Sequence, residues 1–232
     1  MEMILKSVKI YFEDDFCQRG AVMSWGEKFF KRNRDYKPLY RYLKKLVGTE
    51  ETKRLFFRAG EELDALMKRF PDIPKGERNH SDNYIFPRVA IYRVLKRKFG
   101  DEAIKMIDDV VDVQGGKMGS FLRMFTSLPF AEKLFLRIFV VVAENMFGEQ
   151  NGFALKMHVS SPDTVKFDIL DCTYCRYCKK CGCPELIHTF CDSDEYCFGN
   201  LSKITFIRTQ TLEHGEKCDF TLAAKHSGAR KI

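Results

Sequence analysis

The sequence predicts an α+β fold, in which a mainly helical part, residues 1–150, is followed by a ββααββ unit, residues 151–232. The evidence is a change in hydrophobic periodicity near residue 152. Before it, apolar residues recur every three or four positions, as on one face of a helix. After it, apolar and polar residues alternate, as in half-buried strands. We expect the helices to pack on one face of an antiparallel sheet, and the two parts to form one compact unit.

The helices of the first part are predicted from apolar stripes and from signals at their ends. One helix runs from Leu55 to Phe70 and stops at a proline, and the next covers residues 86–99 and ends at a glycine. An aspartate then caps a helix through DEAIKMIDDVVD, and a further helical stretch ends near Phe147. Two segments rich in Gly, Pro or Asn, residues 71–83 and residues 114–120, are predicted to be irregular.

The strands of the second part are predicted as two hairpins. Residues 153–161 and 164–170 alternate apolar and polar side chains on either side of an SPD turn. Residues 203–212 and 217–224 repeat the pattern across a loop that contains Gly215. Two candidate helices lie between the hairpins, which completes the ββααββ order.

Charge and composition narrow the classes of function. The net charge is +7, and much of the excess lies in residues 31–46 and 92–100, which are typical of solvated helix faces. No nucleic-acid-binding motif is present, so a small anionic substrate is the expected partner rather than DNA or RNA. The N-terminus has no secretory h-region, and the most apolar stretch, residues 134–147, is interrupted by Arg137 and Glu144. We therefore expect a cytoplasmic protein without membrane contact, and a homo-oligomer is compatible with this prediction.

The cysteines are concentrated in CTYCRYCKKCGCPELIHTFC, which runs from Cys172 to Cys191 and holds six of the nine. An odd number of thiols in a cytoplasmic protein argues against a disulfide framework. The spacing misses the bacterial ferredoxin pattern, because the Cys-Pro pair at Cys183 comes one residue too late. Two interpretations stay open from spacing alone: a zinc knuckle of C-x2-C pairs, and an amphipathic helix whose buried face contains cysteine.

A longer motif runs through the last third of the chain. A Cys-x-Tyr pair is followed by Gly-x-Pro-Glu-Leu, a Cys-x-x-Asp, an Arg-Thr-x-Thr-Leu strand, a glycine turn and a Cys-Asp-Phe strand. The residues are Cys172, Tyr174, Gly182, Pro184, Glu185, Leu186, Cys191, Asp194, Arg208, Thr209, Thr211, Leu212, Gly215, Cys218, Asp219 and Phe220. With this motif the chain resembles the L-2-amino-thiazoline-4-carboxylic acid hydrolase family. Upstream, Ile73, Gly76 and Asn79 resemble a family loop, although its doubled glycine is missing. The ββααββ part is also similar to the 4-vinyl reductase and TRAPP-type ligand-binding fold.

The resemblance implies a hydrolase that opens a cyclic amidine bearing a carboxylate, acting on its carbon–nitrogen bonds by adding water. Cys191 is the expected nucleophile, and a position at the start of a helix would lower its thiol pKa. Asp194 is expected to transfer protons, and Cys172 is a further catalytic candidate. The structural alternatives are a buried small residue for Cys191 and a helix cap for Asp194.

The expected substrate-binding residues are Arg208, Asn79 and Cys218. The guanidinium of Arg208 suits a substrate carboxylate, and the alternative is an arginine on the exposed side of a strand. No cofactor is required by this scheme. One alternative is a zinc enzyme, in which Cys172, Cys191 and Cys218 hold a metal that activates water. Another is a small-molecule sensor that binds the same ligand without turnover.

Overall fold

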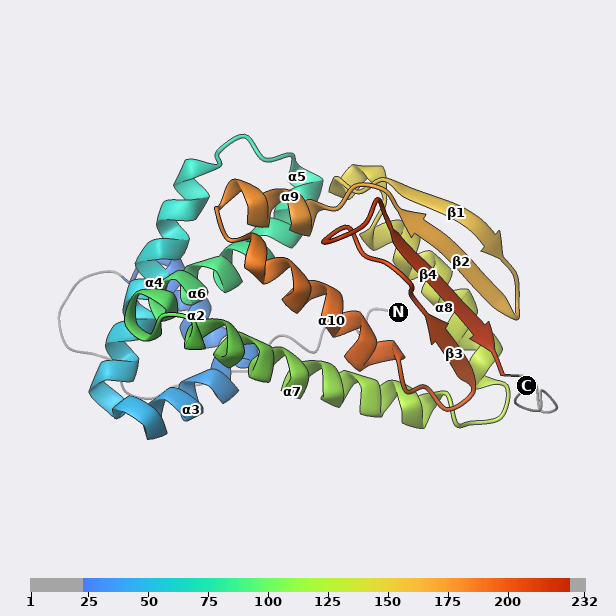
Figure 1. Ribbon diagram of the computed structural model, residues 1–232, viewed down its shortest axis with the longest axis horizontal. Helices are drawn as coiled ribbons and strands as arrows, with labels where there is room; N and C mark the ends of the chain where they lie inside the picture. Colours follow the sequence, from blue (N-terminus) through green and yellow to red (C-terminus); the bar gives the residue numbers. More distant parts are fainter. Residues whose placement is uncertain (1–22, 226–232) are drawn as a thin grey trace.

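A four-stranded antiparallel sheet lies at one end of the molecule and a group of helices at the other (Figure 1). The computed structural model describes residues 23–225; residues 1–22, where a secretory signal was not expected, lie outside this range. The helices are α2 Trp25–Arg32, α3 Lys37–Val47, α4 Thr49–Arg69, α5 Lys75–His80, α6 Phe86–Phe99, α7 Glu102–Phe125, α8 Ala131–Met146, α9 Thr173–Lys180 and α10 Ile187–Phe198. The strands are β1 Leu155–Ser160, β2 Thr164–Ile169, β3 Ile204–Ile207 and β4 Cys218–Ala224. The predicted α+β class is confirmed.

The sheet follows the predicted ββααββ order, with the strands arranged β1-β2-β4-β3 and all pairs antiparallel. Phe167 on β2 lies opposite Phe220 on β4, and their rings stack 4.8 Å apart. Alternate residues of these strands face α8, which covers the rear of the sheet in Figure 1 and packs Phe135 and Leu136 into this core. β3 is shorter than expected and ends at Ile207, so Arg208 lies just beyond the strand.

A second core joins the N-terminal helices to α9. Its largest fully buried side chains include Leu43, Leu63 and Phe86. Cys172, Tyr174 and Leu212 are partly buried and pack against both this core and the core under the sheet. The segment that carries the family motif therefore lies where the two cores meet.

The break predicted at residues 114–120 is wrong, because α7 runs through it without interruption. Figure 1 shows α7 and α10 side by side. The glycines allow this close approach: a Cβ at Gly115 would collide with the side chain of Tyr196, and one at Gly119 with the carbonyl oxygen of Tyr196. They serve packing between helices rather than a turn, and packing partners cannot be seen in a local pattern.

We expect Gly119→Ala to lower the free energy of unfolding by about 2 kcal/mol, because the added methyl group meets backbone that cannot move aside. Gly116→Ala is the matched control. A Cβ at Gly116 meets no atom within 4 Å, so this change should stabilise α7 by roughly 0.5–1 kcal/mol through helix propensity. Chemical denaturation of both variants measures the difference. Equal stability of the two would contradict this account of α7.

Residues 71–83, also predicted to be irregular, are largely helical. α5 is followed directly by a π-helical turn, Ser81–Ile85, a feature often found near functional sites. Glu77 on α5 is buried and accepts hydrogen bonds from the Tyr177 hydroxyl at 2.9 Å and from Arg176 at 3.1 Å. These contacts tie α5 to α9, so long-range packing stabilises a segment whose composition is typical of a loop.

The helical interpretation of the cysteine run is confirmed. α9 covers Thr173–Lys180, with Cys172 at its N-cap position. Cys175 and Cys178 lie on its buried face, and Cys181 and Cys183 follow it in the same core. Cysteine acts here mainly as a small apolar residue.

Candidate active site

The candidate residues come together from separate parts of the chain. Cys172 and Cys175 lie at the start of α9, Cys191 and Asp194 lie on α10, and Arg208 and Cys218 flank the loop between β3 and β4. Figure 1 shows that β4 begins beside α9, which brings this loop close to both helices. Cys172 and Cys191 are partly exposed, so the cluster reaches the surface.

Cys191 and Cys218 form a hydrogen-bonded pair of thiols. The pair is asymmetric, because the backbone N–H of Leu212 also donates to the Cys218 sulfur at 3.2 Å. The Cys191 hydrogen bond lowers the pKa of Cys218, and the Leu212 N–H and nearby Arg208 act in the same direction against burial. The same bond, together with burial, raises the pKa of Cys191. Any thiolate in this pair is therefore best stabilised on Cys218.

Cys191 does not lie at the start of a helix, so that part of the sequence interpretation is wrong. It is the fifth residue of α10, which begins at Ile187. The positive end of the helix dipole stabilises a thiolate only within the first turn of a helix, and Cys191 lies beyond the first turn of α10. The Cys191 thiol has only Cys218 as a hydrogen-bonding side-chain partner among the described residues.

A second thiol pair lies at the start of α9. Cys172 donates a hydrogen bond to Cys175, which lowers the pKa of Cys175 and raises that of Cys172. The two pairs are near enough for Cys175 and Cys218 to influence each other's charge. Within residues 23–225, no group of three or more His, Cys, Asp or Glu side chains is arranged to hold a metal ion.

Arg208 and Asp194 are in direct contact, as the sequence hypothesis of a shared site requires. Nη1 of Arg208 donates to Oδ2 of Asp194 at 3.0 Å and to the carbonyl oxygen of Cys191 at 2.8 Å. The guanidinium is only 9% exposed. Burial raises the pKa of Asp194 to about 7, although Arg208 opposes the shift. A carboxyl group with this pKa can donate and accept protons near neutral pH.

Asn79 is not part of the cluster. It is exposed on α5, and its side chain accepts a hydrogen bond from Asn83 at 3.2 Å. Its neighbour His80 is buried instead: Nε2 lies 3.0 Å from the carbonyl oxygen of Met146, and Nδ1 lies 2.9 Å from the Tyr174 hydroxyl. Because a carbonyl only accepts, Nε2 carries the proton and Tyr174 donates to Nδ1. The sequence interpretation missed His80 because it treated this segment as a loop.

Arg88 on α6 is a second residue that the sequence interpretation missed. It donates to the carbonyl and hydroxyl oxygens of Thr189, both at 3.0 Å, and stacks 3.9 Å above the Phe190 ring. Within residues 23–225 it forms no salt bridge, although the carboxyl group of Asp35 is near enough to interact with it electrostatically. Arg88 interacts electrostatically with Tyr174, and Tyr174 in turn with Asp194. The apolar stripe of α6 predicts where Arg88 lies on the helix, but not these contacts with residues far away in the chain.

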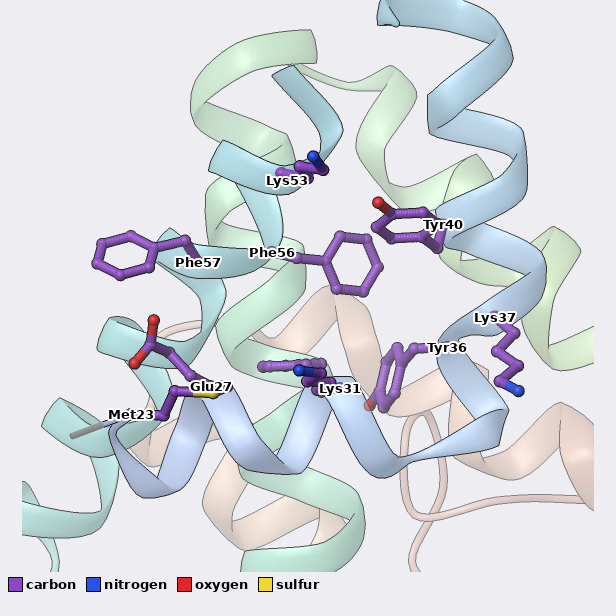
Figure 2. Close-up of a pocket in the computed structure, with 10 residues that line it drawn as sticks. Met23, Glu27, Lys31, Tyr36, Lys37, Tyr40, Lys53, Phe56 and Phe57 are labelled. Carbon is purple, nitrogen blue, oxygen red and sulfur yellow. The ribbon is translucent and has the colours of Figure 1, made fainter. Parts of the chain in front are cut away.

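A cavity of about 300 Å³ lies elsewhere, among α2, α3 and α4. Figure 2 shows the rings of Tyr36, Tyr40 and Phe56 turned toward it, with lysine side chains nearby. A second hollow of about 410 Å³ lies between α6 and the end of α9. Neither includes Cys191, Asp194, Arg208 or Cys218 in its lining. We therefore base the candidate active site on the thiols and their charged neighbours rather than on these hollows.

The model of one protein family, described as L-2-amino-thiazoline-4-carboxylic acid hydrolase, matches residues 78–222, more than half of the chain. The chain belongs to this family. The matched range contains both thiol pairs, Asp194, Arg208 and Arg88, whereas the cavity in Figure 2 lies outside it. Family membership supports a hydrolase-type function.

No curated protein and no solved structure matches, so the likeness to the 4-vinyl reductase and TRAPP-type fold stays a prediction. No described helix has the length and apolar character needed to cross a membrane.

Proposed function

We propose that this protein hydrolyses a small cyclic amidine that carries a carboxylate, such as a 2-aminothiazoline-4-carboxylate, through a cysteine nucleophile. The observation that carries the proposal is the Cys191–Cys218 pair beside the Arg208–Asp194 ion pair, within the range that the family model matches. A low-pKa thiol next to a carboxyl group with a pKa of about 7 is the combination that nucleophilic attack with proton transfer requires.

In this proposal the nucleophile is Cys218, and Cys191, the attacking residue expected from the sequence, is its hydrogen-bond donor. The Cys218 thiolate attacks the amidine carbon, and the electron pair of the C=N bond moves to the ring nitrogen. That nitrogen takes a proton from the neutral carboxyl group of Asp194. The bond from the same carbon to the ring sulfur then breaks, in place of the carbon–nitrogen bond expected from the sequence, because a thiolate leaves more readily than an amine. Cys191 gives its proton to the departing sulfur.

Water completes the reaction and restores the site. It attacks the carbon that is now bound to Cys218, and the Asp194 carboxylate takes one of its protons. The carbon–sulfur bond to Cys218 breaks and releases the thiolate, while the remaining proton returns to Cys191. The net change is the addition of one water and the opening of the ring to a thiol and a urea. Arg208 holds Asp194 and the Cys191 backbone in place through its two hydrogen bonds.

We propose Arg88, in place of Arg208, as the anchor for the substrate carboxylate. Arg208 already faces the carboxylate of Asp194, so a second anion there would meet an occupied donor. Arg88 is partly buried and forms no salt bridge within residues 23–225, where Asp35 acts on it only at longer range, and a buried charge is stabilised by a closer counter-charge. A substrate carboxylate would supply it. Tyr174 lies between Arg88 and the thiols, at the meeting point of the two cores.

Turnover of 2-aminothiazoline-4-carboxylate by the purified protein, followed as formation of the ring-opened product by mass spectrometry, tests the function. Arg88→Gln should raise KM by about 10–100-fold, since charge-assisted hydrogen bonds contribute roughly 1.5–3 kcal/mol, and should change kcat less. The carboxamide analogue of the substrate provides the matched control, because wild type and variant should bind it equally weakly. A variant that still prefers the carboxylate would exclude Arg88 as the anchor. Binding of the substrate without turnover would favour a sensor instead.

A further inference from the structure

An apolar stripe covers the side of α8 that faces away from the sheet. Leu134, Ile138, Val141 and Val142 recur at helical spacing, and each is between 42% and 50% exposed. The opposite side of the same helix is buried in the core of the sheet. α8 is therefore apolar on two sides, and a helix with that character is normally covered on both.

Further exposed apolar side chains lie in and just before the α7–α8 connection. Phe130, directly before α8, is 82% exposed, and its φ of 62° places it in the left-handed region that bulky residues avoid. Such a backbone conformation persists only where the surrounding structure holds it, so Phe130 presents a fixed apolar ring at the start of α8. The last turns of α7 and the connection add further exposed apolar side chains, namely Met118, Phe121, Met124 and Leu128.

The size of the α8 stripe fits the apolar centre of a protein interface. The four α8 side chains and Phe130 together present roughly 500 Å² of apolar surface. A stable protein–protein interface buries about 800 Å² on each partner, with an apolar centre and a polar rim. The stripe would supply the centre, and the polar side chains beside it would supply the rim.

We propose that this surface joins two copies of the chain, with the two α8 helices antiparallel around a twofold axis near Val141. The charges beside the stripe support this arrangement. Arg137 and Glu144 are exposed and lie on one side of α8, two turns apart, and neither forms an ion pair within residues 23–225. An antiparallel pairing centred between residues 140 and 141 places Arg137 of each copy opposite Glu144 of the other. Such self-complementarity is the signature of a twofold interface.

Sedimentation equilibrium of the full chain over a concentration series tests the proposal. We expect a mass twice the 27.1 kDa of one chain. Val141→Asp should raise the dissociation constant of the dimer by about 30-fold or more, because it buries an unpaired charge at the centre of the interface. Leu170→Asp is the matched control: Leu170 is exposed to a similar extent in the turn after β2, and its replacement should leave the dimer intact. Circular dichroism checks that both variants are folded.

Charge exchange tests the orientation of the two helices. Arg137→Glu alone should weaken the dimer, and the double variant Arg137→Glu, Glu144→Arg should restore it. Failure of the double variant to do so would overturn the antiparallel arrangement. A wild-type protein that stays monomeric at all concentrations would overturn the dimer. If that monomer bound vesicles of anionic phospholipid, and Val141→Asp abolished the binding, the surface would be a membrane contact instead.

Discussion

Cys218→Ser should reduce turnover of the cyclic amidine by about 10³-fold or more, because the serine hydroxyl is not ionised at neutral pH and attacks far more slowly than a thiolate. The fold should be unaffected, since serine is close to cysteine in size and can still accept the Leu212 N–H. Steady-state kinetics together with thermal unfolding measure both effects. Cys197→Ser serves as the control, because Cys197 is partly buried on α10 with only a weak 4.0 Å contact to the Gly115 carbonyl.

Replacement of Cys191 distinguishes the two possible nucleophiles. If Cys218 attacks, Cys191→Ser should keep part of the activity, because its hydroxyl still donates to the Cys218 sulfur and the ring sulfur can depart as a thiolate without the proton of Cys191. Cys191→Ala should lose more activity and shift it to higher pH. If Cys191 attacks, as the sequence first suggested, Cys191→Ser should be as inactive as Cys218→Ser. Limited alkylation with iodoacetamide near neutral pH, followed by peptide mapping, should label Cys218 before Cys191 if the lower pKa of Cys218 outweighs its deeper burial.

Asp194→Asn should lower kcat/KM by about 10²–10⁴-fold, the usual effect of losing a proton-transfer group. The pH profile provides the sharper test. The first step needs Asp194 protonated, and its pKa is about 7, so wild-type kcat/KM should fall as the pH rises through that value. The variant should lack this descending limb. An unchanged profile in Asp194→Asn would exclude Asp194 as the acid.

The same carboxyl group should influence stability in a defined direction. Its folded-state pKa of about 7 is above the ordinary 3.8, so the stability it contributes is full below pH 3.8 and is lost as the pH rises through 7. The loss is at most about 4 kcal/mol, and less in practice because Asp194 stays 29% exposed. Asp194→Asn should therefore gain stability relative to wild type between pH 4 and pH 8. Urea denaturation at both pH values measures this, and a constant difference would contradict the raised pKa.

The two pairs of strands and the helix within the cysteine run could be predicted from the sequence, because their signals are local. Alternation in TVKFDIL places Val165, Phe167 and Ile169 on one side of a strand, whatever that side later meets. Cysteines three residues apart in α9 make one buried helix face in the same way. The placement of Cys191 and Asp194 on the same side of α10 also follows from their spacing, since residues three apart on a helix lie on one face.

Other features were decided only by the tertiary structure. Gly115 and Gly119 look like a turn until α10 is placed beside α7, where only glycine allows the approach. The assignment of the thiolate in the Cys191–Cys218 pair depends on the backbone N–H of Leu212, in the loop before β4, which donates to the Cys218 sulfur. Local periodicity determines which side of a segment is apolar. The contacts that set pKa values and counter-charges join segments far apart in the chain, and these form only when the two cores pack together.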